Sequence, residues 1–278
     1  MHKFKSQLPI KSLALATAGL LSLLPNPAAA QYAGGVVSYL PGDGVTAGYN
    51  DPAHALGSPT TFIGYQDTDP FNPPYLASQL VSIGAGGSLT LQFNSPIFNS
   101  PDHSFGLDFS IFGNAGFAIT NGDYTGGGIT DGSLFGNNTG TTRVWVSADN
   151  LNYYLLDPAR ARTVDGLAPT DAAGDFTRPL NPGLTQNDFA GLGLAGIRAL
   201  YGGSGGGTGY DISWAEDGSG HSVFLSDISF VRIDVLTGKS EIDAIVAVPE
   251  PGSLALGLLA LGMFAGNRCL GKRPKATL

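Results

Sequence analysis

The sequence predicts an all-β domain of the β-sandwich type over residues 31–247, between hydrophobic segments at 1–30 and 248–278. Short runs of β-branched and aromatic residues alternate with clusters of Gly, Asp, Asn and Pro, the pattern of strands and turns. Several runs alternate apolar and polar residues with a period of two, as strands that bury one face do. No repeat of about 20–50 residues is visible, so we expect neither a solenoid nor a propeller.

The first 30 residues have the features of a removable secretory signal peptide. A basic start, with Lys3, Lys5 and Lys11, directly precedes an apolar run at 12–24. That run is too short to cross a hydrocarbon core about 30 Å thick. Small residues at 28–30 then supply a cleavage pattern, so we expect a signal helix that is absent from the mature protein.

Six segments are the clearest candidate strands of the central domain. In the first, Leu89, Leu91 and Phe93 share one face, and polar residues occupy the other. This alternation predicts half-buried strands that pack face to face. A weak, glycine-containing helix is expected at 187–201. The candidate strands are at 87–93, 106–112, 143–147, 152–156, 230–235 and 241–246.

The C-terminal segment begins with a short proline motif and continues as an apolar, Gly-spaced run at 253–267, followed by scattered basic residues. Apolar residues before a basic end predict a short transmembrane helix that leaves 31–247 outside the cytoplasm. This order resembles the PEP-CTERM sorting signal of Gram-negative bacteria. The resemblance implies transient anchoring in the inner membrane, processing by an exosortase, and delivery to the cell surface or extracellular matrix. The motif residues are Val248, Pro249, Glu250 and Pro251.

The order of the strands over 36–247 resembles the galactose-binding-like jelly roll found in surface proteins of this kind. The segments that carry the resemblance are 50–59, 87–93, 107–114, 144–153 and 231–233. The resemblance implies a jelly-roll β-sandwich whose loops at one end often bind sugar, with a structural Ca²⁺ near the chain ends in many members. Long inserts at 114–142 and 158–209 depart from the compact form of that fold.

The charge of the central region excludes nucleic acid as a partner. Residues 31–247 hold 7 basic and 21 acidic residues, a net charge of −14, whereas nucleic-acid binding needs a basic face. Of the acidic residues, 19 are Asp on a Gly-rich background. These Asp are explained either as turn residues that keep a secreted domain soluble or as oxygen ligands for Ca²⁺. The single Cys269 lies in the tail, so the domain has no disulfide.

Candidate calcium ligands lie where the resemblance brings the chain ends together, at Asp51, Glu241 and Asp243. Glu241 and Asp243 are two apart on a predicted strand and therefore share a face. Such a carboxylate pair is costly unless an ion or solvent compensates for it. A second option is the pair Asp67 and Asp69.

Candidate sugar-binding aromatics are Tyr65, Phe71, Tyr75 and Tyr124, which would stack on sugar rings, although they could equally fill small loop cores. A GxGxxG match at 191–196 lacks the flanking strand and βαβ unit of a dinucleotide site. A GxSxG match at 202–206 lies in a glycine-rich connector and predicts no nucleophile. His54, His103 and His221 do not cluster, as zinc ligands would. His103 and His221 lie in polar loops, where we expect histidines to be solvated.

These observations predict an exported, non-catalytic surface or matrix protein that contacts exopolysaccharide or another glycan. One alternative is a structural biofilm component without a defined ligand. Another is a surface hydrolase, which would need two carboxylates facing each other across a cleft. The sequence nominates no such pair, because so many Asp residues are candidates.

Overall fold

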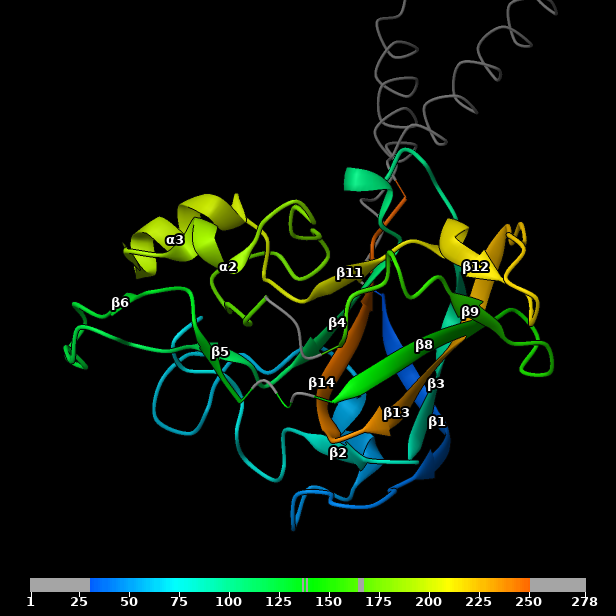
Figure 1. Ribbon diagram of the computed structural model, residues 1–278, viewed down its shortest axis with the longest axis horizontal. Coiled ribbons are helices and arrows are strands. Elements are labelled where there is room, and N and C mark those ends of the chain that lie inside the picture. The colour runs from blue at the N-terminus through cyan, green and yellow to red at the C-terminus, as the bar shows by residue number, and fades with distance from the viewer. Residues whose placement is uncertain (1–30, 137, 139, 165–167, 251–278) are drawn as a thin grey trace, which may run out of the picture. The chain divides into compact units, whose positions relative to one another are not determined.

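The computed structural model describes residues 31–136, 138, 140–164 and 168–250. The predicted signal helix and transmembrane helix lie outside these residues. In the described part of the chain, no helix is long and apolar enough to cross a membrane. The prediction of a β-rich domain is confirmed, because strands dominate and the helices are short (Figure 1).

A single antiparallel sheet forms the main body of the domain. Its order is β11-β4-β14-β1-β3-β13-β8-β9-β12, with β2 paired to β14. The strands are β1 (Gln31–Leu40), β2 (Val81–Gly84), β3 (Ser88–Phe98), β4 (Phe109–Gly113), β8 (Thr141–Ser147), β9 (Tyr154–Leu156), β11 (Thr208–Tyr210), β12 (Ala215–Glu216), β13 (Asp227–Thr237) and β14 (Lys239–Ala247).

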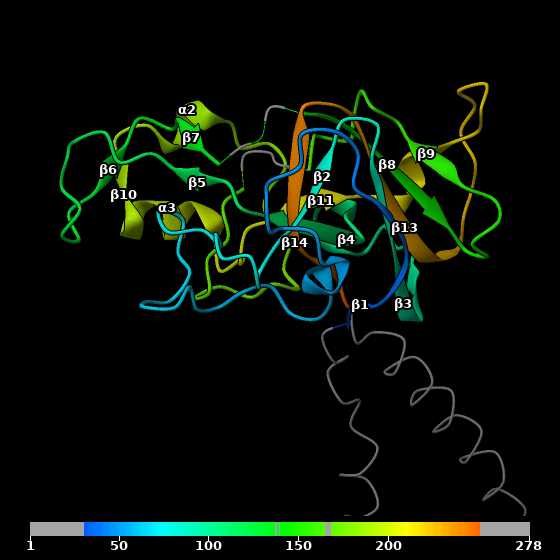
Figure 2. The ribbon, with the colours of Figure 1, turned by 90° about the horizontal axis from the view of Figure 1, so that it is seen from below.

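Strand β1 joins the two halves of this sheet. Gln31 and Tyr32 pair with the end of β14, whereas the strand pairs with β3 from Ala33 onward. The register shifts just after Ala33, and a β-bulge at such a place bends the strand. Gly34 allows this bend, since a Cβ there would lie 2.5 Å from the side chain of Asn94. The sheet therefore curls, with the β4–β14 half and the β3–β13 half on different sides (Figure 2).

One apolar core draws on both halves of the curled sheet. The predicted apolar face of β3 is confirmed, since Leu89, Leu91 and Phe93 are buried. On the opposite face Gln92 is exposed, as predicted, but Thr90 is buried. Strand β14 differs from the prediction, because every residue from Ser240 to Ala247 is buried. Both of its faces are covered, one by the core and the other by loops that bond to its polar side chains.

The two long inserts fold together around a second apolar core. This insert lobe contains the strand pairs β5 (Gly116–Phe117) with β7 (Leu134–Phe135) and β6 (Ile129–Thr130) with β10 (Leu192–Gly193). It lies beside the main sheet in both views (Figures 1 and 2). Its core residues are Phe71, Phe117, Leu180, Phe189, Ile197 and Tyr201.

The predicted helix at 187–201 is interrupted. The structure has α2 (Gln186–Phe189), then β10, then α3 (Leu194–Tyr201). Gly191 takes a left-handed backbone with φ of +81°, and its N–H donates to the carbonyl of Thr130 at 2.8 Å. In the GxGxxG match, Gly191 therefore serves a chain reversal, Gly193 lies in a strand pair and Gly196 lies within α3. This is not the geometry of a dinucleotide loop.

Candidate functional site

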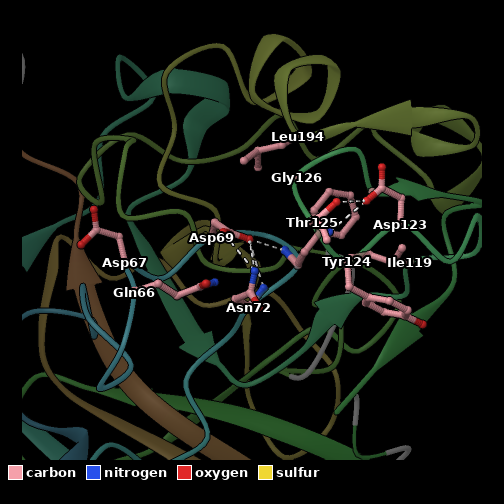
Figure 3. Close-up of a pocket in the computed structure, with 12 residues that line it drawn as sticks. Gln66, Asp67, Asp69, Asn72, Ile119, Asp123, Tyr124, Thr125, Gly126 and Leu194 are labelled. Carbon is pink, nitrogen blue, oxygen red and sulfur yellow. Dashed lines mark hydrogen bonds between the residues drawn. The ribbon is translucent and has the colours of Figure 1, made fainter.

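The insert lobe carries a pocket of about 480 Å³. Its walls come from the 66–72 loop, the 119–128 loop that joins β5 to β6, and the first residue of α3. In Figure 3, Asp69 and Asn72 lie at the centre, with Asp67 on one side and Asp123 and Tyr124 on the other. The lining residues are Gln66, Asp67, Asp69, Phe71, Asn72, Ile119, Asp123, Tyr124, Thr125, Gly126, Gly128 and Leu194.

Side-chain bonds to the backbone hold the 119–128 loop in shape. Asn121 closes the loop, because its amide donates to the carbonyl of Gly127 at 2.9 Å and its oxygen accepts from the N–H of Ile129 at 3.0 Å. Asp123 accepts from the hydroxyl of Thr125 at 2.7 Å and from its N–H at 2.9 Å. These bonds lower the pKa of Asp123, so this carboxylate is charged and fixed in position.

The opposite wall is fixed by Asp69, which forms an Asx turn. Its Oδ1 accepts from the N–H groups of Phe71 at 2.8 Å and Asn72 at 3.1 Å, and the Asn72 amide donates to both of its oxygens at 3.1 Å. Asp67 differs, because no hydrogen bond from the described residues reaches its exposed carboxylate. Asp67 is therefore available to a ligand, whereas Asp69 mainly shapes the wall.

The chemistry of the lining restricts what the pocket could bind. Phe71, Ile119 and Leu194 form an apolar surface, and amide, hydroxyl and carboxylate groups surround it. The described lining residues include three Asp and no Lys, Arg or His, so the local potential is negative. Such a pocket disfavours anionic ligands. It suits a neutral polyhydroxylated ring or a cation, because acceptors and an apolar face lie side by side.

The structure separates the four aromatic residues that the sequence nominated for sugar binding. Phe71 and Tyr124 line the pocket, and Tyr65 and Tyr75 do not. Tyr124 is 76% exposed and is free to stack on a ligand, whereas Phe71 is 8% exposed and packs into the second core. The polar lining residues Asn72 and Thr125 were not foreseen, and only the Gly-rich stretch around Thr125 marked that loop in the sequence.

The three nominated calcium ligands each bond to their own chain. Asp51 caps the 3₁₀ turn η2 (Pro52–Ala55) by accepting from the N–H of Ala53 at 2.9 Å. Glu241 accepts from Thr46 and Asn114, and Lys239 Nζ lies 3.2 Å from its Oε1.

Asp243 is buried and accepts from the N–H of Thr60 at 2.8 Å and from its hydroxyl at 2.7 Å. Burial raises the pKa of Asp243 to about 7, against the bonds from Thr60. In the described part of the chain, no three His, Cys, Asp or Glu residues gather closely enough to hold a metal ion. A shared calcium ion at these carboxylates stays a prediction, and Glu241 and Asp243 are not solvent-exposed.

The prediction of a solvated His103 is wrong. Its side chain is completely covered, and Nδ1 lies 2.8 Å from Oδ1 of Asp108, which is also buried. The sequence offered no clue to this, because His103 lies in a polar segment and Asp108 is five residues away. His221, in contrast, is 80% exposed in its side chain, as expected of a loop histidine.

The first residues of the predicted sorting motif belong to the described fold. The N–H of Val248 donates to the carbonyl of Asp108 at 2.8 Å, which extends the β14–β4 ladder by one residue. Glu250 places its Oε1 3.4 Å from Nε2 of His103.

Comparison with protein families matches residues 247–273 to the PEP-CTERM protein-sorting motif. This supports an exported surface protein whose C-terminal tail is processed by an exosortase. A search of curated proteins found no match to the chain.

Proposed function

We propose that the protein is an exported, non-catalytic surface or matrix protein that contacts a neutral polysaccharide through the pocket of its insert lobe. The observation that carries the export is the sorting motif at 247–273. The main body is a jelly-roll β-sandwich in this proposal, supported by the curled antiparallel sheet around one core. The inserts, which depart from the compact jelly roll, provide the binding surface together with the 66–72 loop.

The lining of the pocket supports a neutral glycan as the ligand class. Tyr124 offers an exposed ring on one side of the pocket, and Asp67 and Gln66 offer hydrogen-bonding groups on the other (Figure 3). Sugar recognition combines an aromatic face with hydrogen bonds to hydroxyl groups, and both are present here. The three Asp residues would repel uronate, sulfate or phosphate groups, so acidic polysaccharides are expected to bind weakly or not at all.

Two of the three carboxylates of the pocket, Asp69 and Asp123, are poorly suited to glycoside hydrolysis, which supports a non-catalytic role. A general acid needs a raised pKa, and that of Asp123 is lowered. Asp69 is saturated with amide donors. The carboxyl with a pKa near 7, Asp243, is covered by the Thr60 segment and is not among the lining residues.

A glycan array with the full-length protein in detergent tests the binding proposal. We expect neutral glycans to bind and acidic ones to fail. Tyr124→Ala should weaken binding about tenfold, equivalent to about 1.4 kcal/mol. Tyr65→Ala is the matched control, because Tyr65 is 65% exposed and lies outside the pocket. Equal binding by both variants and the unchanged protein would exclude this pocket, leaving the structural role without a defined ligand.

The sorting assignment has its own test. In a host that carries an exosortase, alanines at Pro249, Glu250 and Pro251 should leave full-length protein in the inner membrane. A variant that is still released with normal mass would refute the assignment.

A further inference from the structure

A buried polar cluster lies where β14 continues into the sorting motif. Asp108, the residue just before β4, accepts from three donors, two of which are N–H groups of the backbone. Ser100 N donates to Oδ1 at 3.0 Å, and Ile212 N donates to Oδ2 at 2.8 Å. The third partner is Nδ1 of His103 at 2.8 Å. A carboxylate with two such amide donors acts as an acceptor, so Nδ1 of His103 carries a proton.

The bond to Asp108 fixes the orientation of the imidazole ring and aims Nε2 at the sorting motif. Nε2 lies 3.4 Å from Oε1 of Glu250, and both atoms are buried. Neither atom has a hydrogen bond within the described residues. Because Nδ1 already carries a proton, this contact is a hydrogen bond when one further proton lies between Nε2 and Oε1. Either the imidazole of His103 or the carboxyl of Glu250 can carry that proton.

Asp108 also holds the main chain of the motif. Its carbonyl accepts from the N–H of Val248 at 2.8 Å, next to the Phe109–Ala247 pair of the β4–β14 ladder. Beyond Val248 no backbone hydrogen bond of the described residues continues the ladder, and the flanking Pro249 and Pro251 have no N–H to donate. Beyond Val248, Glu250 is therefore held by its side chain.

We propose that His103 and Asp108 form a docking site for Glu250, by which the folded domain holds its own sorting motif. The Glu250 carboxylate faces a buried imidazole, so a processing enzyme that reads this side chain gains full access only when the contact opens. The folded domain therefore slows removal of the tail. This inference rests on the sorting role of residues 247–273 and is independent of glycan binding.

Two substitutions at His103 separate the docking contact from the fold. The amide of His103→Asn can take the place of Nδ1 and keep the bond to Asp108, but it has no group at the position of Nε2. His103→Gln retains a donor near the position of Nε2. The Glu250 side chain is 28% exposed, so the contact is partly screened and we expect effects of roughly two- to fivefold.

Hydrogen exchange of the full-length protein in detergent measures the docking directly. Only Val248 and Glu250 have exchangeable backbone N–H groups within 248–251. Exchange there should be roughly two- to fivefold faster in His103→Asn than in the unchanged protein, and near normal in His103→Gln. Glu250→Ala removes the docked side chain and leaves the buried His103–Asp108 pair intact. It should accelerate exchange at Val248, and it controls for a folding defect in His103→Asn. Unchanged exchange in both His103→Asn and Glu250→Ala would overturn the proposal.

A pulse-chase experiment in a host that carries an exosortase measures the consequence. His103→Asn should lose its tail roughly two- to fivefold faster than the unchanged protein, with His103→Gln in between or normal. If His103→Asn exchanges faster but loses its tail at an unchanged or slower rate, the inference that docking of Glu250 slows tail removal is overturned. Failure of the Pro249–Pro251 alanine variant to block sorting would instead overturn the sorting assignment itself.

Discussion

The buried carboxyl of Asp243 makes the stability of this domain depend on pH in an unusual direction. Asp243 is 2% exposed, and both of its oxygens face a single residue, Thr60, through bonds of 2.8 and 2.7 Å. Burial raises its pKa from 3.8 to about 7, since the charged form loses its hydration. In the folded protein the carboxyl is therefore neutral at pH 5, whereas in the unfolded chain it is largely ionised there.

The sign of the effect follows from the protons bound in each state. Between pH 4 and pH 7 the folded protein binds more protons at this site than the unfolded chain, so the free energy of unfolding falls as pH rises. The loss is complete above pH 7. A difference between pKa values of 3.8 and about 7 corresponds to at most about 4 kcal/mol, at about 1.4 kcal/mol per pH unit.

Asp243→Asn mimics the neutral carboxyl, because its oxygen accepts from the N–H of Thr60 and its amide donates to the hydroxyl. Urea unfolding of the full-length chain in detergent at intervals from pH 4 to pH 8 measures the difference between variant and unchanged protein. We expect near equality at pH 4 and a variant that is more stable by up to about 4 kcal/mol at pH 8. Asp51→Asn is the control and should change little, since Asn caps a helix as well as Asp.

A constant difference between Asp243→Asn and the unchanged protein across this pH range would refute the reasoning. It would mean that Asp243 is ionised in the fold at every pH tested. The Thr60 bonds would then outweigh the cost of burial, the opposite of the balance derived above.

Two further measurements test the metal and the insert lobe. If calcium binds through Asp243, EDTA should lower the melting temperature by several degrees at pH 8, because a ligand at a hundredfold over its Kd stabilises the folded state by about 2.7 kcal/mol. Asp243→Asn should abolish this response to EDTA. Identical melting curves with and without calcium would refute calcium binding. Arg198→Ala should cost about 2 kcal/mol, because it strips both 2.8 Å bonds from the buried Asp171. In the control pair, Arg232 lies 2.7 Å from Asp234 and the pair is more exposed. Arg232→Ala should therefore lower the free energy of unfolding in urea by less than about 1 kcal/mol. Equal losses of stability in the two variants would contradict this account.

The sequence predicted those parts of the protein that depend on local pattern. The alternation of Leu89, Leu91 and Phe93 placed a strand and its buried face correctly, because a period of two is a property of neighbouring residues. The sorting motif was also readable, since it is defined by the order of a short proline segment, an apolar run and basic residues. The break at Gly191 was not predicted, because a glycine within a helical pattern does not by itself show whether the helix continues.

The candidate sites depend on contacts between residues that are far apart in the chain. Thr60 and Asp243 are 183 residues apart, and the pocket joins the 66–72 loop to the 119–128 loop and α3. His103 looked like a solvated loop residue, and only packing against Asp108 and Glu250 buries it. Composition and periodicity thus determined a β-rich exported domain. Tertiary structure alone decided which polar groups are buried and paired, because burial depends on which distant segments cover a residue.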